Sequence, residues 1–144
     1  MYQILLTPLV AAVIAQVSKF FIGANHLKIG VTNLVAYSGM PSGHSALMIS
    51  LVTIIGLELG IQDPLFAVCV VLTILVLRDA VGLRRYLGQH GKVLNILVKD
   101  LKDDEVLDYK YPALLEKIGH TPAQVAVGSL IGFLVSLASY FIVS

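Results

Sequence analysis

The chain has 144 residues, of which 57% are hydrophobic and only 13% are charged, and its mean hydropathy is +0.87. A soluble domain carries about a quarter charged residues, so this composition excludes an ordinary water-soluble fold. The single cysteine excludes an internal disulfide framework.

Four apolar segments predict membrane-spanning helices at residues 4–23, 42–60, 65–82 and 122–142. Each is long enough, or nearly so, to cross about 30 Å of hydrocarbon. No basic residue precedes the first segment, so no cleavable targeting signal is expected. We therefore expect residues 1–144 to form a single all-α domain. It would be an integral membrane helical bundle with about four transmembrane helices.

The positions of the charges predict how this bundle is oriented. All ten lysines and arginines lie near the ends of the first and third segments or in the loops that follow them. Those loops share one side of a four-span bundle. By the positive-inside rule that side faces the cytoplasm and both termini lie outside, as in a bacterial inner membrane protein.

The second loop on the basic side, residues 83–121, carries a helical pattern of its own. Its apolar residues recur at roughly helical spacing between charged positions, at Val93, Leu94, Leu97, Val98 and Leu101. This pattern predicts a cytoplasmic amphipathic helical insertion. The helix would either lie on the leaflet or pack against the bundle.

Polar residues from all four predicted helices are expected at the basic side. Pro41-Ser42-Gly43-His44 opens the second helix, where a helix N-terminus suits an anion. Histidine at membrane depth is costly, which favours a functional role. The remaining groups lie at the corresponding ends of the other helices: Lys19, Lys28, Arg78, Asp79, Arg84, Arg85 and His120.

This set of residues suits phosphoryl transfer, in which cations and N–H donors stabilise the phosphate oxygens. Two histidines can divide the work, one attacking phosphorus and the other protonating the leaving oxygen. The four histidines lack close ligand spacing and there is no cysteine cluster, so neither a metal site nor a cofactor is expected.

Three stretches support a family assignment. Residues 40–45, MPSGHS, resemble the second signature of the phosphatidic acid phosphatase type 2 superfamily, which also includes vanadium haloperoxidases. Residues 79–88 and 119–128 are similar to its divergent bacterial and plastid branch. The motifs occur in the same order, from about Lys19 to Gly132.

The resemblance implies a role for each matching residue. Ser42 and the Gly43 amide would bind phosphate, His44 would be the general acid, and His120 would be the nucleophile that forms a phosphohistidine. Further phosphate-binding groups would be Arg84 or Arg85 on one side of an insertion, with Lys19 and Lys28 in the first motif.

Two departures from the family pattern concern the nucleophile. The family has an aspartate four residues after it, where this chain has Gln124, whose amide oxygen would accept the Nδ1–H bond without supplying charge. Asp79 is a candidate for the electrostatic role. His90 follows Arg84 by six positions, as in the compact family motif, but Leu94 takes the orienting place after it, so His120 is favoured.

The expected function is hydrolysis of an amphiphilic phosphomonoester or prenyl diphosphate by a metal-independent membrane lipid phosphatase. The expected partners are the lipid phosphate and the membrane, and no nucleic acid. The alternative is a non-catalytic lipid-binding or lipid-transporting protein on a degenerate phosphatase scaffold. A homodimer is left open by the spacings Gly56-x-x-x-Gly60 and Gly128-x-x-x-Gly132.

Overall fold

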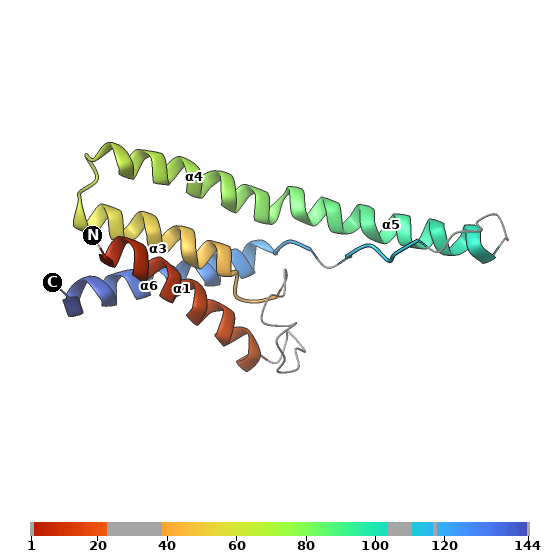
Figure 1. The fold of residues 1–144 in the computed structure, drawn as a ribbon, viewed down its shortest axis with the longest axis horizontal. Helices are drawn as coiled ribbons and strands as arrows, with labels where there is room; N and C mark the ends of the chain where they lie inside the picture. Colours follow the sequence, from red (N-terminus) through yellow and green to blue (C-terminus); the bar gives the residue numbers. More distant parts are fainter. Residues whose placement is uncertain (1, 23–38, 104–110, 117, 144) are drawn as a thin grey trace.

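The computed structural model describes residues 2–22, 39–103, 111–116 and 118–143, and these are helical or irregular, with no strand among them. The expected all-α membrane bundle is confirmed (Figure 1). The helices are α1 (Tyr2–Ser18), α3 (Gly43–Glu58), α4 (Pro64–Val81), α5 (Leu83–Asp103) and α6 (Pro122–Val143), and a short 3-10 helix, η1 (Lys19–Phe21), extends α1.

The bundle is organised around α3, which packs against α1, α4 and α6. Small side chains allow these close approaches, since the buried set includes Ala11, Ala15 and Ala46. Hydroxyl groups add hydrogen bonds between helices. Ser136 Oγ lies 2.7 Å from Ser50 Oγ in the buried α3–α6 contact.

Three of the four glycines in the predicted small-residue pairs lie at contacts within the described chain, whereas Gly60 has no neighbour within 4 Å. A Cβ atom at Gly128 would lie 2.2 Å from the Ser42 carbonyl oxygen, and one at Gly132 would lie 2.2 Å from that of Ala46. A Cβ atom at Gly56 would meet the Phe66 ring at 2.9 Å. These three glycines therefore bring α6 and α4 onto α3, so they give no support to a homodimer.

The outer surface of the bundle is apolar. Among the described residues, three helical stretches are long and apolar enough to cross a membrane, namely Tyr2–Phe21, the α4–α5 stretch and α6. The shorter apolar helix α3 has 16 residues and lies among them. Large hydrophobic side chains stay exposed around these helices, for example Leu5, Val71 and Leu134. Lipid is the environment that suits such a surface.

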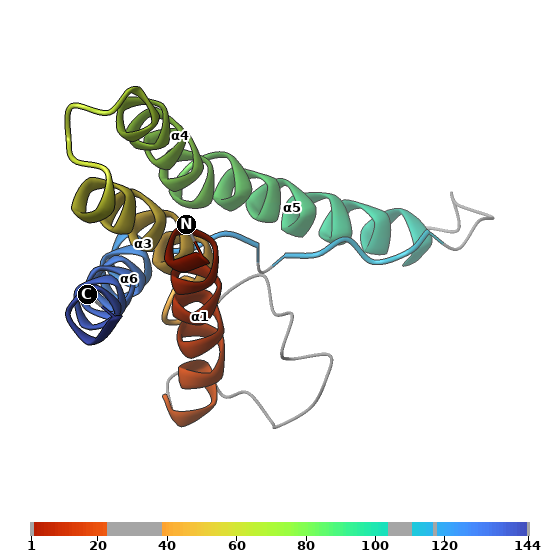
Figure 2. The same ribbon diagram turned by 60° about the vertical axis from the view of Figure 1, so that its left-hand side comes forward.

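A single residue, Gly82, separates α4 from α5. Helix α5 continues almost in line with α4, away from the bundle (Figures 1 and 2). Apart from its junction with α4, it makes no substantial contact with another described helix. The expected amphipathic helix is present, and it begins ten residues earlier than the apolar pattern at Val93 suggested. The alternative in which it packs against the bundle is wrong, because the short junction holds it in line with α4.

Residues 111–116 run back along α5 toward the bundle (Figure 1). They lie against two glycines of α5, since a Cβ atom at Gly88 would be 2.5 Å from the Glu116 carbonyl oxygen and one at Gly91 would be 2.8 Å from that of Leu115. Asn95 bonds both backbone groups of Leu114, donating from Nδ2 and accepting at Oδ1, each at 2.9 Å. This contact fixes the path by which the chain returns to α6.

Candidate functional site

The polar ends of α1, α3, α4 and α6 meet at one end of the bundle, opposite the chain termini (Figures 1 and 2). We call this region the polar end. It contains Lys19 from η1, the first turn of α3, the α4–α5 junction and the residues just before α6. Segments far apart in the sequence therefore contribute to one site.

Two imidazole rings face this region. His44 is the second residue of α3 and is exposed, whereas His120 is only 4% exposed. Their ring centroids are 6.5 Å apart, with an angle of 55° between the ring planes. The two rings, from the start of α3 and from the residues just before α6, are therefore neighbours at the polar end.

The backbone around His120 holds it against the α4–α5 junction. Its N–H donates to the Ala80 carbonyl at 2.9 Å. Gly119 has a φ of +88°, and a Cβ atom there would lie 2.7 Å from the Arg85 backbone nitrogen. Glycine is therefore required at this turn, because it combines a left-handed conformation with a close backbone approach.

The first turn of α3 is capped within the protein. Ser42 is fully buried, and its Oγ accepts hydrogen bonds from Ser45 N at 3.3 Å and Ser45 Oγ at 2.8 Å. Its own N–H donates to the Gln124 carbonyl at 3.0 Å. Ser42 thus serves as the N-cap. The following N–H groups, of Gly43 and His44, have no acceptor within the helix because they belong to its first turn.

Sequence reasoning missed Gln16. A Cβ atom at Gly43 would lie 3.2 Å from Gln16 Oε1, so this amide of α1 stands beside the start of α3. The available signal was a polar residue in an apolar segment, three positions before Lys19 and therefore on the same helix face.

The cations at the polar end differ in their surroundings. Lys19 is only 2% exposed. Arg84 donates from Nε to Asp79 Oδ2 at 2.6 Å, in an ion pair that crosses the α4–α5 junction, with both side chains 34% exposed. Arg84, Lys19 and Asp79 lie near enough to His44 for their charges to interact with its ring. Arg85 is exposed.

Electrostatics favour a neutral His120. Burial lowers the pKa of His120 below the ordinary value of 6.5, and the positive charges of Lys19 and His44 lower it further. The nearby Gln124 amide and the Gly39 backbone act in the opposite direction. A neutral imidazole is the form that can act as a nucleophile at neutral pH.

Gln124 is engaged in capping α6. Its Oε1 accepts from the Thr121 N–H at 2.9 Å, and its own N–H donates to Thr121 Oγ1 at 3.3 Å. Together these bonds form a capping box. Nδ1 of His120 is buried and has no hydrogen-bond partner within the described ranges. The expected bond from Nδ1–H to the Gln124 amide oxygen is therefore not formed in this structure.

The other predicted residues are placed as follows. Lys28 lies outside the described residues. Arg78 is exposed in the last turn of α4, and His90 is exposed near the middle of α5. His90 belongs to a helix that leaves the bundle (Figure 1). His120, in contrast, has its ring beside that of His44.

Comparisons with known proteins identify the family of this chain. The Divergent PAP2 family matches residues 1–135, and the chain belongs to this family. A curated relative, described as the uncharacterized membrane protein YuiD of Bacillus subtilis (strain 168), is 36% identical over an alignment of 150 residues. The alignment covers 95% of this chain and 94% of the relative. No solved structure matches the chain.

Proposed function

We propose that this member of the divergent PAP2 family is a membrane lipid phosphatase that acts through a phosphohistidine intermediate. The observation that carries the proposal is the pair of imidazole rings 6.5 Å apart, brought together from positions 76 residues distant in the chain. Around them stand Lys19, the Arg84 guanidinium and the first turn of α3.

In the proposed first step, a ring nitrogen of neutral His120 attacks phosphorus and the bond to the leaving oxygen breaks. Protonated His44 donates its proton to that oxygen, and the leaving group departs, which is the lipid alcohol of a phosphomonoester or the prenyl monophosphate of a prenyl diphosphate. In the second step His44 takes a proton from water, the water oxygen attacks phosphorus, and the P–N bond to His120 breaks. Inorganic phosphate is released and both histidines regain their starting forms.

The phosphate oxygens would be held by charges and N–H donors that are already in place. Arg84 uses Nε for Asp79, which leaves its terminal nitrogens available for phosphate. Lys19 adds a second positive charge, and the N–H groups of Gly43 and His44 add the helix N-terminus. The proposed reaction needs no metal, since these groups supply the positive charge that it requires.

The substrate class follows from the position of the site. Apolar helix surfaces lead directly to the polar end, so a phosphomonoester or prenyl diphosphate could keep its chains in the leaflet while its headgroup reaches His120. Since the lysines and arginines gather at this end in the sequence, we propose that the site faces the cytoplasm, with both termini outside.

The test is phosphate release by the detergent-purified protein from a panel of lipid phosphates: a phosphatidate, a phosphatidylglycerophosphate and a prenyl diphosphate. Turnover of at least one member is expected. Arg84→Ala should lower kcat/KM by about 10²-fold or more, because a donor that stabilises the transition state is lost. Binding without release across the whole panel would contradict the proposal.

Arg85→Ala is the matched control, since it removes the same side chain from the neighbouring position. Arg85 is exposed, and we expect its loss to change kcat/KM by less than about threefold. If Arg85→Ala were the damaging change and Arg84→Ala the harmless one, the assignment of the phosphate-binding arginine would be wrong.

A second candidate function is non-catalytic lipid binding or transport on the same scaffold. The observation that favours it is the capping role of Gln124, which leaves Nδ1 of His120 without a hydrogen-bond partner in the described part of the chain. A ring whose Nδ1 lacks a hydrogen bond is held less firmly in one tautomer and is therefore a poorer nucleophile. The same panel separates the two candidates, since a binding protein would retain lipid phosphates and release no phosphate.

A further inference from the structure

The exposed apolar surface of α5 has a regular spacing. Five leucines and one histidine follow one another at alternating spacings of four and three residues along one face of the helix. We call this face the seam; it consists of Leu83, Leu87, His90, Leu94, Leu97 and Leu101. Spacing of this kind is the a/d pattern of a coiled coil.

Most of the seam is uncovered within the described chain. Leu83 is 67% exposed, Leu87 59% and Leu97 50%. Residues 111–116 lie on a neighbouring face of the helix, the face of Gly88, Gly91 and Asn95. The opposite side carries a row of exposed cations seven residues apart, Arg85, Lys92 and Lys99, which is the outward position in a coiled coil.

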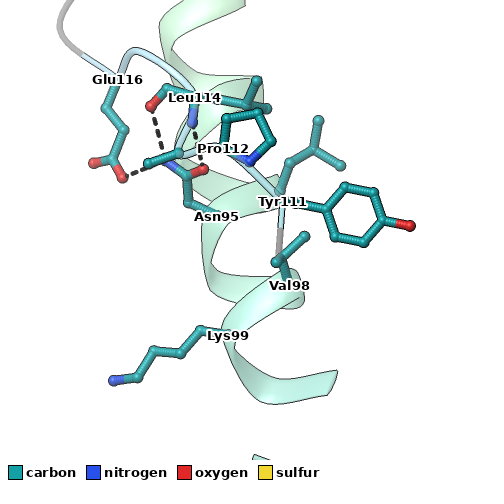
Figure 3. A pocket seen from close by; sticks show the side chains of 9 residues that line it. Asn95, Val98, Lys99, Tyr111, Pro112, Leu114 and Glu116 are labelled. Atoms are coloured by element: carbon teal, nitrogen blue, oxygen red, sulfur yellow. Dashed lines mark hydrogen bonds between the residues drawn. The ribbon is translucent and has the colours of Figure 1, made fainter. Parts of the chain in front are cut away.

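A groove opens beside the seam (Figure 3). It has a volume of about 540 Å³ and is lined by α5 and residues 111–116, including Leu94, Val98 and Leu114. Figure 3 shows the Asn95 contacts with Leu114 and Glu116 that hold its walls together. Leu94 belongs to both the seam and the groove, so the apolar surface is wider than the seam alone.

The direction of α5 decides what can cover this surface. Helical hydrogen bonds reach Gly82 from both sides, from Gly82 N–H to the Arg78 carbonyl at 2.8 Å and from Tyr86 N–H to the Gly82 carbonyl at 3.1 Å. The Asp79–Arg84 ion pair and the Gly119 contact also cross it. The junction therefore holds α5 in line with a membrane-spanning helix, which keeps it from lying flat on the leaflet.

We propose that the seam binds the seam of a second copy of this chain, in a parallel two-stranded coiled coil. Two copies in one membrane share their orientation, so a two-fold axis along the membrane normal places the α5 helices side by side and parallel. His90 then lies at a central seam position, where a polar residue favours one register. The proposal does not depend on phosphatase activity.

The test is cysteine cross-linking in membranes, in a Cys69→Ala background because Cys69 is the sole cysteine. The parallel pairing brings equivalent seam residues together across the two-fold axis. Leu87→Cys and Leu94→Cys should therefore form covalent dimers under mild oxidation at least about tenfold more than Lys92→Cys and Lys99→Cys. Equal cross-linking at the two faces, or none at the seam, would overturn the proposal.

A second measurement tests whether lipid, rather than a second copy of the chain, lies against the seam. Leu94→Asp should convert a dimer to a monomer in native mass spectrometry, whereas Lys92→Asp should leave the dimer intact. A nitroxide label on Leu94→Cys that is accessible to oxygen but not to a water-soluble relaxer would show that lipid covers the seam. That result, or a monomeric wild-type protein, would contradict the coiled coil.

Discussion

Phosphate release should fall by about 10⁴-fold or more in His120→Ala, for every lipid phosphate that the wild-type protein hydrolyses. The reason is that the imidazole is the proposed nucleophile, and alanine offers no atom that can take up the phosphoryl group. The measurement is single-turnover and steady-state phosphate release by the purified variant. Thermal unfolding in the same detergent shows whether the variant is folded.

His90→Ala is the matched control for this variant. It removes the other histidine whose spacing from Arg84 fits the compact family motif, and it does so at an exposed position on α5. Its kcat should stay within about threefold of wild type. Loss of turnover in His90→Ala with retained turnover in His120→Ala would show that the wrong histidine has been assigned as nucleophile.

His44→Ala should lower kcat by about 10²- to 10⁴-fold on a lipid phosphate, which is the usual contribution of a general acid. Without His44, the departing alkoxide receives no proton. The loss should shrink on an aryl phosphate, whose leaving group needs little protonation. The measurement is kcat for the variant and the wild type on both kinds of substrate.

The dependence on the leaving group distinguishes general acid catalysis from simple phosphate binding by His44. A binding role predicts an equal loss on both substrates and a higher KM. An equal loss would therefore contradict the role proposed for His44, even if the variant were strongly impaired. Ser45→Ala, at the adjacent buried position, is a control for damage to the first turn of α3.

The sequence was informative about the bundle because helix ends follow directly from length and hydropathy. Once spans 42–60 and 122–142 are placed, the starts of α3 and α6 must lie at the same end, and His44 and His120 with them. The distance of 6.5 Å between their rings depends on packing. It results from the glycine contacts of α6 on α3, which a spacing pattern permits but does not assign to a particular neighbour.

Side-chain partners within the site were the least predictable part. Nothing in the pattern distinguished Arg84 from Arg85, whereas the structure pairs Arg84 with Asp79 across the junction and leaves Arg85 exposed. Gln124 was interpreted as the residue that replaces the family aspartate. The residues Thr121-Pro-Ala-Gln124 also match the sequence pattern of a capping box. A local motif and a catalytic motif overlap there, and the local bonds are the ones formed.

The direction of α5 also could not be predicted from the sequence. An amphipathic pattern shows which face is apolar, and it leaves open whether lipid, the bundle or another helix covers that face. The Asp79–Arg84 ion pair, which helps to set the direction of α5, joins residues on the two sides of a one-residue junction.

The most direct measurement is to trap the covalent intermediate. The purified protein would be mixed with a lipid phosphate labelled in its phosphoryl group, quenched in alkali within one turnover, and digested for mass spectrometry. We predict an alkali-stable, acid-labile phosphoryl group on the peptide that contains His120, and none in His120→Ala. Phosphate release without any labelled histidine, or a label on His44 or His90, would contradict the account.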